Sequence, residues 1–215
     1  NEQYGQTECD LVIGFCSEVM DLVPGAIGKA VPGHVVEIIN EDGTIAKPGE
    51  LGEIAVKSPD PVMFLEYWNN PEATRQKYIG DWLRTGDYGT KDDEGHFWFT
   101  GRKDDLIESG GFRIGPGEIE DCLMKHHDVA LVCVLGVPDD IRGQVVKAYV
   151  VPTSGVVADE ALENRIREFV KTRLEAHAYP REIEFLKEMP MTKTGKILKQ
   201  ELRKREQERQ GRQRK

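Results

Sequence analysis

The pattern of apolar residues changes near residue 101, and this change limits the folds open to the chain. Before it, short apolar runs alternate with turn signals, for instance residues 35–39 and 52–56 on either side of Asp42-Gly43. Asp-Gly between apolar runs is a typical hairpin turn, so this part is predicted to be rich in antiparallel strands. Beyond residue 101 strand-like and helix-like periods alternate, which indicates packed helices and strands.

Several elements can be recognised from their patterns. Residues 129–137 and 145–151 are continuous runs rich in β-branched residues, as is typical of strands buried on both faces. The segment 158–177 places its apolar side chains on one helical face and is predicted to be a long helix. The other expected elements are a short helix from Pro71 with Asn70 as its N-cap, helices over 116–126 and from 197 onward, and a strand over 183–186.

The fold class predicted from these patterns is α+β. Residues 1–101 are expected to form a small antiparallel, β-barrel-like subdomain. Residues 102–215 are expected to form an α+β domain with a short central sheet and flanking helices, and the boundary is placed at 102–105. With 215 residues, of which 39% are apolar, the chain can bury a core without disulfides or metals.

Charge and residue usage exclude several classes of function. The formal net charge of −9 argues against a nucleic-acid binder, and no stretch approaches the roughly 20 apolar residues of a membrane span. Lys199 to Lys215 is net basic and is interpreted as a solvated terminal helix, with membrane or nucleic-acid binding as the open alternative. The cysteines and histidines lack metal-ligand spacing, which predicts reduced thiols, a cytoplasmic location and no metal site built from them.

Tyr4-Gly5-Gln6-Thr7-Glu8 places an aromatic ring, a hydroxyl and a carboxylate within five residues. The ring could stack on a base and Thr7 could donate to a phosphate. Glu8 could hold Mg²⁺, which prefers hard oxygen ligands and keeps several waters. Taken alone, the segment has a plainer interpretation as a surface turn.

Two further polar segments follow. Thr85-Gly86-Asp87 places a carboxylate at the expected end of a strand, where it could accept hydrogen bonds from both hydroxyls of a ribose. The alternative is an aspartate that caps a turn. The charged segment 101–105 contains Arg102 and Asp104, and its alternative interpretation is a solvated linker.

The last two segments are a glycine-rich stretch, residues 109–117, and a flexible loop, residues 190–197. Residues 109–117 contain four glycines, which let the backbone approach a ligand closely, but their spacing fits neither the dinucleotide fingerprint nor the Walker A loop. A structural hairpin before a helix is the alternative. Residues 190–197 place Lys196 on a flexible loop before a helix, and a solvated charge is the alternative there.

The order of these segments is more specific than any one of them. YGQTE, TGD, GRKDD, SGGFRIGPGEIE and PMTKTGKI, in that order over essentially the whole chain, resemble the adenylate-forming enzyme superfamily, which comprises acyl-CoA synthetases, adenylation domains and luciferases. In finer detail, residues 97–99, 109–116, 141–148 and 179–181 resemble the medium-chain acyl-CoA synthetases.

The resemblance implies a role for each matching residue of the first part. Tyr4 would stack on adenine, and Thr7 would contact the α-phosphate of ATP. Glu8 would bind Mg²⁺. Asp87 would accept hydrogen bonds from the ribose hydroxyls, with Arg102 assisting.

It likewise implies that residues 102–215 are a mobile lid. Asp104 would be the hinge about which this lid rotates. Lys196 would stabilise charge at the α-phosphate and carboxylate in the first half-reaction. After rotation, Gly110 and Gly111 would line the pantetheine tunnel of CoA, and Arg113 would approach the phosphate of the adenylate.

Lys171 and Arg173, on the long helix, are candidate contacts for the CoA nucleotide by position alone. The implied reaction joins a carboxylic acid to CoA through an acyl-AMP intermediate, with ATP consumed and AMP and pyrophosphate released. It needs no covalent nucleophile on the enzyme, in agreement with the absence of a Cys/His or Ser/His pairing in the motifs. The oligomeric state stays open, with a homodimer among the options.

Two other functions remain open. One is an adenylation module that loads the phosphopantetheine of a carrier protein, and the other is a non-catalytic scaffold. Residues 1–8 contain no initiator Met, and the superfamily's Gly/Ser/Thr-rich phosphate loop is missing from the sequence. We therefore expect the chain to be the C-terminal part of a longer enzyme and to be inactive in adenylation by itself.

Overall fold

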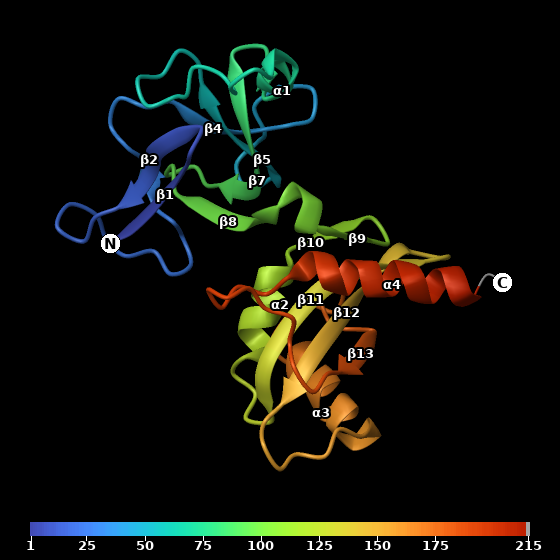
Figure 1. Cartoon of the computed structure of the whole chain (residues 1–215). Helices are drawn as coiled ribbons and strands as arrows, with labels where there is room; N and C mark the ends of the chain where they lie inside the picture. The colour runs from blue at the N-terminus through green and yellow to red at the C-terminus, as the bar shows by residue number, and fades with distance from the viewer. Residues whose placement is uncertain (214–215) are drawn as a thin grey trace. The chain divides into compact units, whose positions relative to one another are not determined.

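The chain divides into two compact units in a computed structural model that describes the backbone of residues 1–213 and the side chains of residues 1–209 (Figure 1). The first unit is Asn1–Asp104 and the second is Asp105–Lys215. The division lies inside a 3-10 turn, η1 (Lys103–Asp105), in which Asp104 is exposed. The roles predicted for the two parts, and for Asp104 as a hinge, remain predictions.

The first unit consists of two antiparallel sheets and a short helix. One sheet has the order β1-β2-β3, and the other has the order β4-β5-β7-β6 with β8 paired to β7. The bounds are β1 Glu2–Gln6, β2 Cys9–Phe15, β3 Lys29–Ala30, β4 Val36–Ile39, β5 Gly52–Lys57, α1 Pro71–Gln76, β6 Tyr78–Ile79, β7 Trp82–Lys91 and β8 Phe97–Arg102. Over the described residues both sheets are open, so the barrel-like prediction corresponds to two open antiparallel sheets.

The second unit contains a five-stranded sheet with helices on its faces. Its strand order is β10-β9-β12-β11, and β13 joins β12 in parallel. The bounds are β9 Ile107–Ser109, β10 Phe112–Ile114, α2 Pro116–Leu123, β11 Val129–Asp139, β12 Gly143–Pro152, α3 Glu160–Lys171, β13 Glu182–Phe185 and α4 Lys199–Gln213. The predicted α+β class, with a central sheet and flanking helices, is confirmed.

Alternation along β11 explains how the sheet is covered on both faces. Val132 and Val134 belong to the apolar cluster that includes the buried faces of α2 and α3. Cys133 and Leu135 belong to a second cluster, which includes Leu202 of α4. Because successive side chains of a strand point to opposite faces, one run of apolar residues serves both clusters.

The helix ends differ from the sequence prediction in one instructive place. The helix predicted over 158–177 is α3, which ends at Lys171 although Leu174 continues the apolar pattern. The hydroxyl of Thr172 donates to the carbonyl oxygen of Glu168, and the Arg173 guanidinium donates to that of Phe169. These side chains satisfy carbonyls of the last turn, so the helix can stop there.

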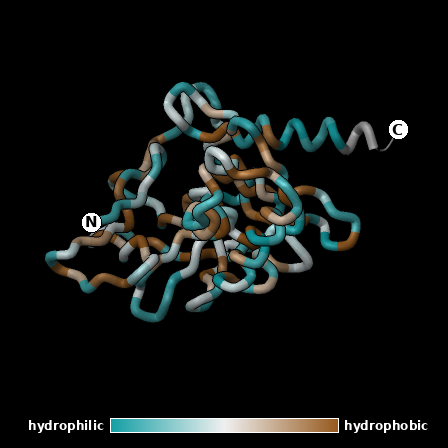
Figure 2. Tube along the Cα trace, turned by 90° about the horizontal axis from the view of Figure 1, so that it is seen from below, coloured by the Kyte–Doolittle hydropathy of each residue, from teal (hydrophilic) through white to brown (hydrophobic). Residues whose placement is uncertain are grey.

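Other predicted helices agree more closely. Asn70 caps α1 as predicted, because its side chain accepts a hydrogen bond from the Ala73 amide. The basic terminal segment forms α4, along which hydrophilic residues predominate (Figure 2); Arg214 and Lys215 lie outside the described residues. Within the described part of the chain, the helices are too short or too polar to cross a membrane.

Candidate functional site

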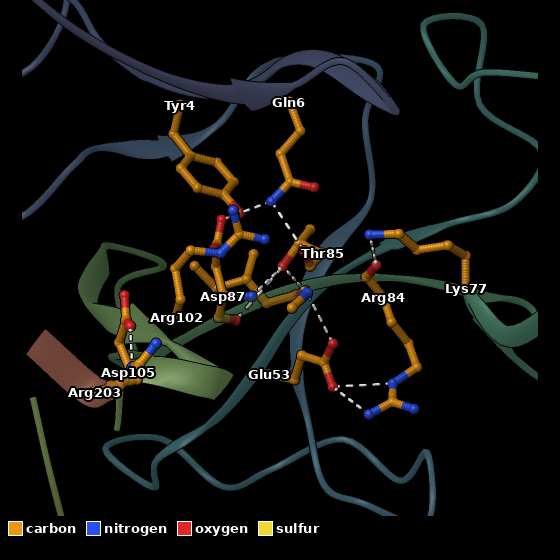
Figure 3. A network of polar contacts seen from close by, with 12 residues as sticks. Tyr4, Gln6, Glu53, Lys77, Arg84, Thr85, Asp87, Arg102, Asp105 and Arg203 are labelled. Carbon is orange, nitrogen blue, oxygen red and sulfur yellow. Dashed lines mark hydrogen bonds and ion pairs between the residues drawn. The ribbon is translucent and has the colours of Figure 1, made fainter. Parts of the chain in front are cut away.

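A buried carboxylate, that of Asp87, is the centre of a polar cluster in the first unit (Figure 3). The register of β7 and β8 pairs Asp87 directly with Arg102, whose Nε lies 3.5 Å from Asp87 Oδ1. The other oxygen, Oδ2, accepts hydrogen bonds from the Tyr4 hydroxyl at 2.8 Å and from Gln6 Nε2 at 2.6 Å. Three strands therefore converge on one carboxylate that is only 7% exposed.

The strand β1 delivers Tyr4 and Gln6 to the same face because they are two residues apart. Between them the register of β1 against β2 shifts, and a Cβ atom at Gly5 would lie 2.5 Å from the carbonyl oxygen of Asp10. Only a glycine allows this close approach of the two strands. Burial raises the pKa of Tyr4, so its phenol stays protonated and donates to Asp87.

The cluster forms one wall of an open cleft of about 610 Å³ in the first unit. Its lining includes Thr7, Glu8, Lys77 and Phe99 as well as Tyr4. The cleft thus combines two aromatic rings, the hydroxyl of Thr7, two carboxylates and two cations. The second carboxylate, Asp87, and the second cation, Arg102, belong to the polar cluster described above. Such a set of groups suits a ligand that carries a flat ring, hydroxyls and phosphates.

The predicted role of Glu8 as a ligand of Mg²⁺ requires an ionised carboxylate. Its Oε1 accepts a hydrogen bond from the Tyr67 hydroxyl, and this bond holds the pKa of Glu8 below its ordinary value against the opposing effect of burial. The carboxylate is therefore ionised at neutral pH. One ionised carboxylate in an open cleft is the kind of site that Mg²⁺ shares with waters and phosphate oxygens.

Several residues that line the cleft, or bind a residue of its lining, were missed by sequence reasoning. Gln6, Tyr67 and Lys77 carry no motif of their own, although Gln6 lies inside a segment that was singled out. Tyr67 is separated from Glu8 by 59 positions in the sequence, so only the fold reveals the pair. Thr85-Gly86-Asp87 was expected at a strand end, but it lies inside β7, where the register against β5 shifts.

The remaining predicted residues belong to the second unit. Gly110 and Gly111 have φ values of 58° and 87°, and they join β9 to β10 as a two-residue turn with Ser109 paired to Phe112. Positive φ at both turn positions is the type I′ pattern, which glycine adopts without strain. Arg113 follows on β10, with Nε 3.7 Å from Glu108 Oε1.

Lys171 and Arg173 make local contacts at the end of α3. The Lys171 ammonium lies 2.8 Å from Glu168 Oε1, and the Arg173 guanidinium lies over the Phe169 ring at 3.6 Å from its centroid. Both side chains are exposed. Their proposed contact with a nucleotide therefore stays a prediction.

Lys196 lies on an exposed turn before α4. The turn is closed by a bridge between Met191 and Ile197, and the Lys196 amide donates to Thr192 Oγ1 at 3.0 Å. Over the described side chains, the ammonium of Lys196 has neither an ion pair nor a hydrogen bond. The backbone of this residue is thus fixed while its charge remains available.

His126, His127 and Asp128 lie close together in the second unit, within reach of one metal ion by distance alone. However, His126 Nδ1 accepts the Asp128 amide at 3.1 Å, and Asp128 Oδ2 pairs with Arg165. The imidazole rings are stacked at an angle of 13°, so their lone pairs do not converge. These engaged groups form a local structural cluster.

Comparison with known proteins agrees with this fold. Residues 118–196 match the family model of the AMP-binding enzyme C-terminal domain. An uncharacterised acyl-CoA ligase of Bacillus subtilis (strain 168), YtcI, is 47% identical over 95% of this chain. The mitochondrial acyl-coenzyme A synthetase ACSM3 of Rattus norvegicus is 44% identical, also over 95% of this chain. The chain spans 39% and 36% of the length of these two relatives.

A solved structure shows the same likeness in three dimensions. The anthranilate CoA ligase AuaEII, determined in complex with anthranoyl-AMP, matches 95% of this chain with a TM-score of 0.81 and 34% identity; the chain covers 39% of it. The class to which the fold and the matching relatives point is that of AMP-binding enzymes. More narrowly, the chain belongs to the adenylate-forming superfamily, as the order of its motifs predicted.

Proposed function

We propose that the chain is the C-terminal part of an AMP-forming acyl-CoA synthetase. The observation that carries the proposal is the buried Asp87 carboxylate beside Tyr4 and Arg102 on the wall of the cleft. A carboxylate held in this way can accept both hydroxyls of a ribose, while the neighbouring ring offers a surface for the base. The relatives named as acyl-CoA ligases support the same function.

The first half-reaction would be adenylation. A carboxylate oxygen of the acid attacks the α-phosphorus of ATP, the bond to the β-phosphate oxygen breaks, and pyrophosphate leaves with its electron pair. Lys196 would stabilise the negative charge that builds on the α-phosphate and carboxylate oxygens. Mg²⁺ bound by Glu8 would offset the charge of the phosphates.

The second half-reaction would be thioester formation. The thiol of CoA loses its proton to solvent, the thiolate attacks the acyl carbon, and the bond to the AMP oxygen breaks. The Gly110-Gly111 turn has no side chains, so the pantetheine arm could pass close to its backbone. Arg113 would contact the AMP phosphate, and Lys171 and Arg173 the nucleotide of CoA.

The finer features of the proposal follow from the motifs. We expect a medium-chain carboxylic acid as substrate, a cytoplasmic location and a domain rotation about Asp104 between the half-reactions. The name of the rat relative places that protein in mitochondria. An assay across a series of carboxylic acids would identify the acyl chain.

The test is carboxylate-dependent ATP–pyrophosphate exchange by the native protein that carries this chain. Lys196→Ala is expected to lower the exchange rate by about 10²- to 10³-fold, since it removes a charge that stabilises the transition state. Lys193→Ala, in the same exposed loop, serves as the matched control and should stay within about twofold of the native rate. Equal rates in the Lys196→Ala variant and the native protein would contradict the proposal.

A further inference from the structure

The segment that carries Asp87 is a bulge in β7. Glu53 pairs with Tyr88 and Ala55 pairs with Arg84, so one residue of β5 lies opposite residues 85–87 of β7. At the middle of the bulge, Gly86 has a φ of 80°, a left-handed conformation that glycine adopts without strain. Extra residues in a strand change the direction of the side chains beyond them. The shape of this bulge therefore determines where the Asp87 carboxylate points.

Glu53 on β5 binds the bulge at two places (Figure 3). Its Oε1 accepts a hydrogen bond from the Gly86 amide at 2.9 Å, and its Oε2 accepts hydrogen bonds from Arg84 Nε at 2.9 Å and Arg84 Nη2 at 2.7 Å. The Glu53 side chain is buried, with 4% of the residue exposed. Charge-assisted, two-pronged contacts of this kind fix geometry more tightly than a single bond.

The rest of the bulge is bonded within itself and to the strands β5 and β1. Thr85 Oγ1 donates to the carbonyl oxygen of Ile54 at 2.6 Å and accepts the Asp87 amide at 3.1 Å. Gln6 Nε2 donates to the carbonyl oxygen of Thr85 at 3.0 Å as well as to Asp87. An ion pair that only stabilised the sheet would not need the contact to the Gly86 amide, which lies at the point where the chain turns.

We propose that Glu53 is a positioning residue for Asp87, which it orients through the Gly86 amide, with Arg84 holding Glu53 in place. This inference rests on the proposed function, in which Asp87 binds the ribose. Glu53 does not line the cleft; it fixes the bulge whose conformation places the carboxylate on the cleft wall. A small displacement of such a group weakens its contacts with a ligand, because hydrogen bonds depend steeply on distance and angle.

The experiment compares the affinities of the native protein for AMP and for 2′,3′-dideoxy-AMP, which lacks both ribose hydroxyls. The affinity for AMP divided by the affinity for 2′,3′-dideoxy-AMP reports the ribose contact alone, because a general loss of folded protein lowers both affinities together. We expect Asp87→Asn to lower this ratio roughly tenfold or more. Glu53→Gln should lower it about threefold to tenfold, since one amide oxygen cannot accept both Gly86 and Arg84 in the same way.

The matched control is Glu37→Gln, which breaks the Glu37–Lys91 ion pair in the same sheet, 2.8 Å long and away from the bulge. Its ratio should stay within about twofold of the native value. Arg84→Lys keeps a positive charge beside Glu53 but loses the two-pronged guanidinium contact, so a ratio between those of the native protein and Glu53→Gln is expected. If Glu53→Gln does not fold, Arg84→Lys takes its place in the test. The double variant Glu53→Gln/Asp87→Asn should match Asp87→Asn alone.

Two results would overturn the inference. A native protein that prefers AMP, combined with an unchanged ratio in Glu53→Gln and Arg84→Lys, would overturn the inference and leave the proposed function intact. If the native protein binds both nucleotides equally, Asp87 makes no contact with the ribose. That result would contradict both the proposed role of Asp87 and this inference.

Discussion

At the scale of single residues, the site depends on side chains that acquire their chemistry from distant partners. Asp87 is held by Tyr4 and Gln6, which precede it by about 80 positions. The hydrogen bond from Tyr67 lowers the pKa of Glu8. The motif residues are visible in the sequence, but the partners that tune them are not, because their pairing depends on strand register.

The Tyr67–Glu8 pair gives a prediction at this scale. Tyr67→Phe removes the hydrogen bond that lowers the pKa of Glu8, so the pKa of Glu8 should rise. Carboxyl ¹³C NMR titration measures the midpoint directly. The control is Tyr78→Phe, which removes another phenol hydroxyl, one whose pKa is raised by burial. This variant should leave the Glu8 midpoint unchanged.

The same pair has a consequence for stability. Because the pKa of Glu8 is lowered by folding, its contribution to stability is present above the unfolded pKa and is lost as the pH falls through the folded pKa. The stability difference between the native protein and Tyr67→Phe should therefore shrink on acidification. A difference that grows as the pH falls would contradict the assigned hydrogen bond.

At the scale of elements, close backbone approach determines where glycine is required. A Cβ atom at Gly5 would lie 2.5 Å from the Asp10 carbonyl oxygen, whereas one at Gly14 would meet its nearest atoms at 3.6 Å. Gly5→Ala should therefore separate β1 from β2 and lower the stability by about 1–3 kcal/mol. Gly14→Ala, in the same sheet, should change it by less than about 1 kcal/mol. Denaturant titration measures both, and equal losses would contradict the packing described for β1.

The strands β12 and β13 and the helix α4 are joined by a buried lysine. Lys147 is 1% exposed, donates to Glu206, and lies 2.9 Å from Glu184. Burial raises the pKa of Glu206, but the hydrogen bonds from Lys147 and Tyr149 more than offset it, so the pKa is lower than usual. The carboxylate is therefore charged and needs its partner.

Lys147→Met should thus lower the stability of the second unit by about 3–5 kcal/mol, because it removes the buried cation from the buried Glu206 carboxylate and leaves only the exposed Arg209 guanidinium, 3.8 Å away, beside it. Adding Glu206→Gln should recover part of this loss. Lys171→Met removes an exposed ion pair with Glu168 and should cost less than about 1 kcal/mol. Similar losses for the two lysines, measured by denaturant unfolding, would contradict the buried network.

The elements also show how far sequence reasoning reaches. The Asn70 cap, the Gly110-Gly111 turn and the strands at 129–137 and 145–151 follow from local patterns and are present. The end of α3 was misplaced because side chains of Thr172 and Arg173 satisfy the final carbonyls, which the apolar pattern does not reveal. The bulge at Gly86 was missed because it exists only in the pairing of β5 with β7.

At the scale of the whole molecule, two units with separate cores carry different parts of the proposed chemistry. The first unit holds the cleft with Asp87 and Glu8, and the second holds the exposed Lys196 and the glycine turn. The order of motifs was sufficient to identify the superfamily. The acyl chain and the partner thiol depend on contacts with the substrates, so only assays can identify them.

The central claim is tested most directly by the products that the native protein forms from ATP, CoA and a series of carboxylic acids. Mass spectrometry of the reaction should show one acyl-CoA, one AMP and one pyrophosphate for each acid consumed. Formation of ADP and phosphate would contradict the account. So would transfer of the acyl group to a phosphopantetheinylated carrier protein with no transfer to free CoA.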